Sequence, residues 1–172
     1  MAVLVEAISV VIQLTSIEKY IGLDNFDKFE NNNTLCTDGF LARLGFMKPE
    51  DVEAYTKRLE EAGLCHQLNK SACDFVVIDQ QSGCTTRCDW LKVGKVDPGF
   101  GVITCCRHLD DGSMQVFTPE GWEYPGSMSE TFGFSPSEAN KKGLRFLRHE
   151  NGIDVYFSDL SGKEVFVGRT SD

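Results

Sequence analysis

The chain has 172 residues, which is the length of one domain or of two small ones packed together. Hydrophobic residues make up 41% and charged residues 25%, a composition that excludes disordered and fibrous classes. Acids outnumber bases by 26 to 17, so the net charge is −9. A surface this acidic argues against general binding to the phosphate backbone of nucleic acids.

The N-terminal segment 1–14 is apolar, but it has no basic residue and Glu6 interrupts it. It therefore does not resemble an export signal, and it is shorter than the roughly 20 residues that span a bilayer. We expect it to be a buried strand, and no other segment is a membrane candidate. Seven cysteines without an export signal predict reduced thiols and a cytoplasmic location.

The segment 3–12 is rich in Val and Ile and predicts a central strand that is buried on both faces. Residues 15–18, Thr-Ser-Ile-Glu, match a capping box and predict a helix that starts there. Ile17, Tyr20 and Ile21 would form the buried side of this helix. Residues 34–46 then offer strand material, divided by the turn pair Asp-Gly at 38–39.

A second helix is predicted from Pro49, because proline suits the first helical position. Val52, Tyr55 and Leu59 follow at helical spacing, and Gly63 provides the stop. Residues 74–79 return as another central strand. Over 1–82 the order of elements is strand, helix, strand, strand, helix, strand, which predicts a ferredoxin-like βαββαβ unit in an α+β protein. ACT-like and vicinal-oxygen-chelate-type arrangements of the same elements are the alternatives.

The second part, residues 83–172, is predicted to be β-rich and to pack on the first part in one compact domain. Short strands are expected between Gly, Asp and Pro turns, at 90–96, 101–106, 114–117, 144–147, 153–157 and 164–167. A capping box at 135–138 predicts one short helix that ends at Gly143, and residues 159–162 give a hairpin signal.

Cys84 and Cys88 have a spacing that loosely suits zinc, with Cys105, Cys106 and His108 as further candidate ligands. Adjacent cysteines point to opposite faces of a strand, so this set does not favour a tetrahedral site. We expect no structural metal and no cofactor.

Catalytic motifs are not found in the sequence. It has no Gly-x-Ser-x-Gly elbow, no His-Glu-x-x-His pair and no phosphate-binding glycine loop. Cys65 next to His66, and Cys106 two residues from His108, are near in sequence, but this does not supply the geometry of a thiol nucleophile. The sequence therefore disfavours an enzyme, and no catalytic residue is assigned.

The most distinctive segment is 118–126, Thr-Pro-Glu-Gly-Trp-Glu-Tyr-Pro-Gly, within residues 109–140 that contain six acids and no Lys or Arg. Prolines restrict this loop and its aromatic residues offer contact area, so it suits recognition with little loss of entropy. The predicted partner- or ligand-binding residues are Glu120, Trp122, Glu123 and Tyr124. The alternative is that Trp122 fills the core from the loop, because tryptophan is highly buried on average.

Two functional hypotheses follow from the sequence. The first is a non-enzymatic binding protein that uses the acidic aromatic loop to contact a protein partner, with a role of the immunity or antitoxin kind by analogy of charge and size. The second is a small-molecule enzyme or sensor with a pocket between the two parts of the chain. A pocket lined by a histidine and acids would favour the second hypothesis, and a flat aromatic and acidic face would favour the first.

Overall fold

The structure, a computed structural model, describes residues 2–29, 31–112, 115–125, 127–131, 144–150, 153–158 and 163–168. It is a mixed α+β fold in which most regular elements are strands, as the sequence predicts. None of the helices in these ranges is long and apolar enough to cross a membrane.

The predicted strand at 3–12 is instead two strands, β1 (Ala2–Val5) and β2 (Ile8–Gln13), which belong to different sheets. Ala7 separates them with a φ of +49°, a conformation that few residues other than glycine adopt. The backbone of Gln80 donates to the carbonyl of Ala7 at 2.8 Å, and its side-chain Oε1 accepts from the Ala7 amide at 2.8 Å. This clamp holds the bend at which the chain passes from one sheet to the other.

The larger sheet has five strands in the order β3-β4-β2-β7-β8, and every neighbouring pair is antiparallel. β2 lies in the centre and is buried on both faces, which confirms its predicted central place. The other strands are β3 (Cys36–Thr37), β4 (Leu41–Phe46), β7 (Phe75–Asp79) and β8 (Gly83–Cys84).

The helix α3 (Pro49–Glu61) forms as the sequence predicts. It buries Val52, Tyr55 and Leu59 against the larger sheet. At its end the amide of Gly63 donates to the carbonyl of Glu60, and that of Leu64 to the carbonyl of Leu59. This is a Schellman motif, and the φ of +109° at Gly63 is the left-handed conformation that it requires.

The start of the first helix differs from the prediction. α1 (Leu14–Tyr20) begins at Leu14 after Gln13, without a side-chain cap, so the capping box predicted at Thr15 is wrong. The hydroxyl of the next residue, Ser16, donates to Asp74 Oδ1 at 2.6 Å, a tertiary partner that local sequence does not show. Tyr20 was expected on the buried side but is 40% exposed. α2 (Leu23–Phe26) follows and buries Phe26.

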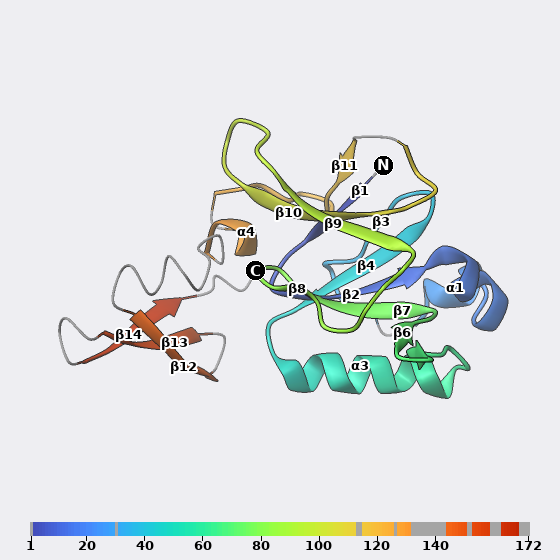
Figure 1. The fold of residues 1–172 in the computed structure, drawn as a ribbon, viewed down its shortest axis with the longest axis horizontal. Coiled ribbons are helices and arrows are strands. Elements are labelled where there is room, and N and C mark those ends of the chain that lie inside the picture. Colours follow the sequence, from blue (N-terminus) through green and yellow to red (C-terminus); the bar gives the residue numbers. More distant parts are fainter. Residues whose placement is uncertain are drawn as a thin grey trace.

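A second sheet has the strand order β11-β1-β10-β9. Its strands besides β1 are β9 (Leu91–Val96), β10 (Ile103–His108) and β11 (Val116–Phe117). Helices α1 and α3 cover one face of the larger sheet, and the second sheet covers the other face (Figure 1). The core therefore has two parts, one under the helices and one between the sheets.

The remaining elements are a hairpin of β5 (Gln67–Leu68) and β6 (Ser71–Ala72), the short helix α4 (Met128–Thr131), and an antiparallel three-stranded sheet. That sheet consists of β12 (Leu144–Glu150), β13 (Ile153–Ser158) and β14 (Lys163–Gly168), at the positions where strands were predicted. The helix predicted from Ser135 to Gly143 and the turn at 159–162 lie outside the described residues.

Candidate functional site

A buried ion pair lies between the two sheets, where β1 ends. Glu6 is 2% exposed and Arg43 on β4 is fully buried, with Arg43 Nη2 at 3.9 Å from Glu6 Oε1. Arg43 Nε donates to Ser9 Oγ at 3.2 Å and Nη1 donates to the carbonyl of Thr34 at 3.0 Å. Burial lowers the pKa of Arg43 while Glu6 opposes that effect. The carboxylate of Glu6 is therefore the charge that compensates a buried guanidinium.

Gly45 makes room for this arginine. A Cβ atom at position 45 would lie 3.0 Å from Arg43 Nη2, which is closer than side chains normally pack. Gly45 and Arg43 are two residues apart on β4 and so share a face of the strand. The absence of a side chain at Gly45 therefore leaves room for the guanidinium inside the core.

The same carboxylate of Glu6 holds the distinctive aromatic loop. The indole Nε1 of Trp122 donates to Glu6 Oε1 at 2.9 Å. The amide and the hydroxyl of Ser129 donate to Glu6 Oε2 at 2.6 and 2.8 Å. These charge-assisted hydrogen bonds join the loop and α4 to the bend after β1, more than 110 residues away in sequence. Trp122 thus contacts the core through its polar edge.

An aromatic cluster lies where this loop meets the tip of the β9–β10 hairpin. The ring of Phe100 packs 5.3 Å from that of Tyr124 and 6.1 Å from that of Trp122, measured between ring centres. The ring of Tyr124 also lies against Gly101, where a Cβ atom would clash with it. Phe100 is 51% exposed, whereas Trp122 and Tyr124 are half-buried. The hairpin tip therefore presents one exposed ring that packs against two half-buried ones.

The four residues that the sequence proposed for binding occupy three different environments. Glu120 and Glu123 are exposed, Tyr124 packs in the cluster, and Trp122 is bonded to Glu6. Phe100 was missed, because it lies in a separate turn region that only the fold brings to the loop. Glu6 was also missed as a site residue, although a lone acid within an apolar strand is a signal of a buried polar partner.

The candidate zinc ligands are divided between the core and the outer face of the second sheet. Cys84, Cys88 and Cys106 pack in the apolar core between the sheets, while Cys105 lies on the opposite face of β10. His108 stacks against Phe40 and Trp90, with ring centres at 5.5 and 6.1 Å. Among the described residues, no three His, Cys, Asp or Glu side chains are arranged to hold a metal ion.

Three of the buried or half-buried thiols also lack the electrostatics of a nucleophile. Burial raises the pKa of Cys36 and of Cys88 to about 11, and it raises that of Cys106 well above the usual value. A reactive cysteine needs the opposite shift, toward the thiolate. His66, next to Cys65, stacks on Phe75 with ring centres 4.8 Å apart. This arrangement gives no support to thiol catalysis.

We predict that the protein, purified without chelator, contains well under one zinc ion per chain. Zinc binds thiolates, and thiols with raised pKa values such as that of Cys88 remain protonated near neutral pH. Elemental analysis checks this expectation. Near-stoichiometric zinc that disappears when Cys84 and Cys88 are both replaced by serine would contradict it.

Comparison with protein-family models, with curated proteins and with solved structures gives no match to this chain.

Proposed function

We propose that this protein is a non-enzymatic binding protein that contacts a basic protein partner through the hairpin tip and the loop beside it. We define this interaction surface as Phe100, Glu120, Trp122, Glu123 and Tyr124. The observation that carries the proposal is the exposed ring of Phe100, which packs against the half-buried rings of Trp122 and Tyr124. Aromatic side chains that are ordered before binding lose little entropy, which is typical of hot spots.

Charge indicates the kind of partner. Glu120 and Glu123 are exposed on either side of Trp122 in the loop, and the whole chain carries −9. Acidic groups around an aromatic anchor complement a basic protein surface and speed its association. A masking role of the immunity or antitoxin kind remains an analogy of charge and size.

The finer fold proposal is that the N-terminal part is a ferredoxin-like unit. In support, the strands β3, β4, β2 and β7 are neighbours in that order, all antiparallel, with α1 and α3 on one face. If β2, β3, β4 and β7 are counted as the first to fourth strands of the unit, their order in the sheet is second, third, first and fourth. This is the strand order of a split βαβ arrangement.

The second hypothesis is a small-molecule enzyme or sensor. It predicts a pocket between the two parts of the chain that is lined by a histidine and acids. The apolar groove described in the next subsection lies on an outer sheet face, and neither histidine nor acid lines it. A catalytic role therefore has less support than the binding role.

The proposal is tested on a partner isolated by cross-linking and then purified. The double variant Glu120→Gln, Glu123→Gln should slow association several-fold at low salt and leave dissociation nearly unchanged. Phe100→Ala should speed dissociation about 30-fold, the equivalent of roughly 2 kcal/mol for a hot-spot ring. Surface plasmon resonance at two salt concentrations measures both rates.

Matched controls come from other exposed positions. Glu60→Gln with Glu61→Gln makes the same charge change at the end of α3, and Leu68→Ala removes an apolar side chain that is 61% exposed. Neither control should alter the rates. If the controls weaken binding as much as the site variants, or if Phe100→Ala binds like the wild type, the interaction surface is assigned wrongly.

A further inference from the structure

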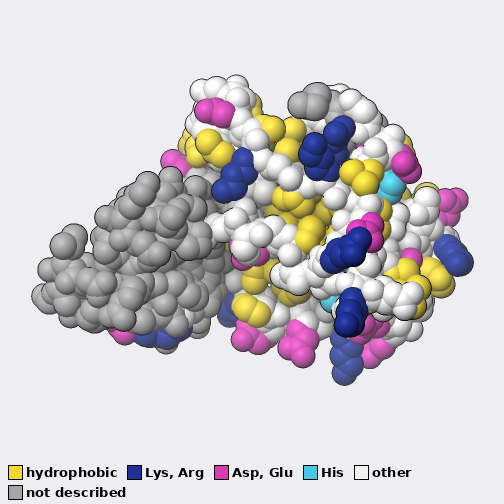
Figure 2. Space-filling view, viewed as in Figure 1, with side chains coloured by type: hydrophobic (Ala, Val, Ile, Leu, Met, Phe, Trp, Pro, Cys, Tyr) yellow, Lys and Arg dark blue, Asp and Glu magenta, His cyan; other side chains and the backbone are white. Residues whose placement is uncertain are grey.

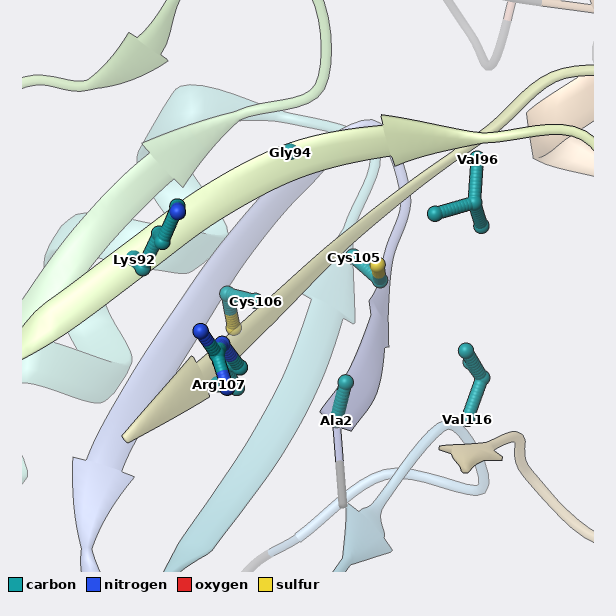
Figure 3. A pocket seen from close by; sticks show the side chains of 8 residues that line it. All are labelled: Ala2, Lys92, Gly94, Val96, Cys105, Cys106, Arg107 and Val116. Carbon is teal, nitrogen blue, oxygen red and sulfur yellow. The ribbon is translucent and has the colours of Figure 1, made fainter. Parts of the chain in front are cut away.

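The outer face of the second sheet, which points away from the larger sheet, contains a groove of about 200 Å³. It is independent of the interaction surface proposed above, because none of its lining residues belongs to that surface. Figure 3 shows Lys92 and Arg107 at one end of the groove, Val96 at the other and Cys105 between them. The groove thus has a charged end and an apolar remainder.

The strand register explains this shape. Lys92 on β9 lies opposite Arg107 on β10, and two residues further along β9 Gly94 lies opposite Cys105. Residues two apart on a strand share a face, so the charged pair and the small pair form consecutive rows of the same surface. A Cβ atom built on Gly94 would meet nothing within 4 Å. The missing side chain at Gly94 therefore opens the middle of the groove.

The charged row places two like charges side by side. Like charges directly opposite each other on neighbouring strands destabilise a sheet. Within the part of the chain that the structure describes, the ion pairs do not include Lys92 or Arg107. Arg107 Nη1 donates to the carbonyl of Asp111 at 2.8 Å, which fixes the guanidinium at the groove. Figure 2 shows Lys and Arg side chains over β9 and β10 beside hydrophobic ones.

We propose that this groove binds a small carboxylate with an apolar tail. The carboxylate would lie between Lys92 and Arg107, because two adjacent cations in a protein of net charge −9 select an anion. The tail would cover Gly94 and Cys105 and extend toward Val96. A volume of about 200 Å³ equals about seven waters at roughly 30 Å³ each, which is room for the carboxylate and the first carbons of a short fatty acid.

The test uses octanoate as the probe and follows backbone amide signals of the full chain by NMR. Octanoate should shift the amides of β9 and β10 in a saturable way, and octanol, with the same tail and no charge, should bind at least tenfold more weakly. Lys92→Gln should weaken octanoate binding about tenfold. Gly94→Leu should abolish the binding by filling the groove, and Gly94 has no positive φ that a side chain would strain.

The matched control is Lys95→Gln. Lys95 lies on the same strand, three residues from Lys92, and so points to the other face. The Lys95→Gln substitution makes the same charge change as Lys92→Gln and should leave the affinity for octanoate within twofold of the wild type. Thermal melts verify that each variant is folded. Lys92→Gln changes only an exposed side chain and is expected to fold. The Lys92→Gln result therefore decides the test if Gly94→Leu does not fold.

Four results would overturn the proposal: no saturable shift with octanoate, equal binding of octanol, equal losses in Lys92→Gln and Lys95→Gln, or shifts centred outside β9 and β10. A capped dipeptide acid, N-acetyl-leucyl-leucine, is included as a second probe. If it bound tenfold more tightly than octanoate, the groove would be a site for a peptide C-terminus, and the proposal of a small free carboxylate would be wrong.

Discussion

Replacing Glu6 by alanine is expected to lower the free energy of unfolding by about 3–5 kcal/mol. The change leaves the buried guanidinium of Arg43 without its compensating charge, and burial already disfavours the charged form of that group. It also removes the acceptor for Trp122 Nε1 and for both donors of Ser129. Urea denaturation followed by circular dichroism measures the loss.

A double-mutant cycle separates the ion pair from the loop contacts. The double variant Arg43→Met, Glu6→Ala should lose less free energy of unfolding than the two single variants lose in sum. The difference should be about 1 kcal/mol or more, because the double variant has no unpaired buried charge. Trp122→Phe tests the loop contact, since it keeps an aromatic ring and removes only the N–H that reaches Glu6. A loss of less than 1 kcal/mol in Glu6→Ala would show that the carboxylate is dispensable to the core.

Leu59→Ala is expected to cost about 2–5 kcal/mol, because Leu59 is fully buried in the core under the helices. The substitution removes apolar contacts and leaves a cavity between α3 and the larger sheet, which relaxes only in part. Thermal and urea melts of the wild type and the variant check the value.

The control for Leu59→Ala is Lys57→Ala on the exposed face of the same helix. Alanine is a good helix former, so this variant should lie within about 0.5 kcal/mol of the wild type. Equal stability of Leu59→Ala and the wild type would mean that α3 does not pack as described.

Elements whose signals are local could be predicted from the sequence. α3 carries its start at Pro49, its buried stripe and its stop at Gly63 within fifteen residues, and each of these works as predicted. The strands at 75–79 and 91–96 likewise follow from short runs of β-favouring residues. In these segments the local propensity and the tertiary fold agree, so nothing remote has to be known.

Elements that depend on remote partners were predicted wrongly or incompletely. The helix begins at Leu14, so Thr15 lies inside its first turn and does not cap it, while Ser16 beside it donates to Asp74, which is 58 residues away. The strand at 3–12 divides at Ala7, where Gln80 clamps the bend from 73 residues away. Both segments carry a tertiary hydrogen bond that the local pattern does not show, and such a bond contributes about 1 kcal/mol, as much as a helix cap.

The sequence by itself determined the α+β class, the second helix and the acidic aromatic character of the loop at 118–126. Only the tertiary structure decided what that loop does inside the molecule, because Trp122 and Ser129 meet Glu6 across 116 and 123 residues. It also decided that the ring of Phe100 packs against that of Tyr124, and that Lys92 lies beside Arg107 at one end of the groove. Composition and periodicity describe neighbours along the chain, whereas strand register and sheet stacking select neighbours in space, and binding sites are built from the latter.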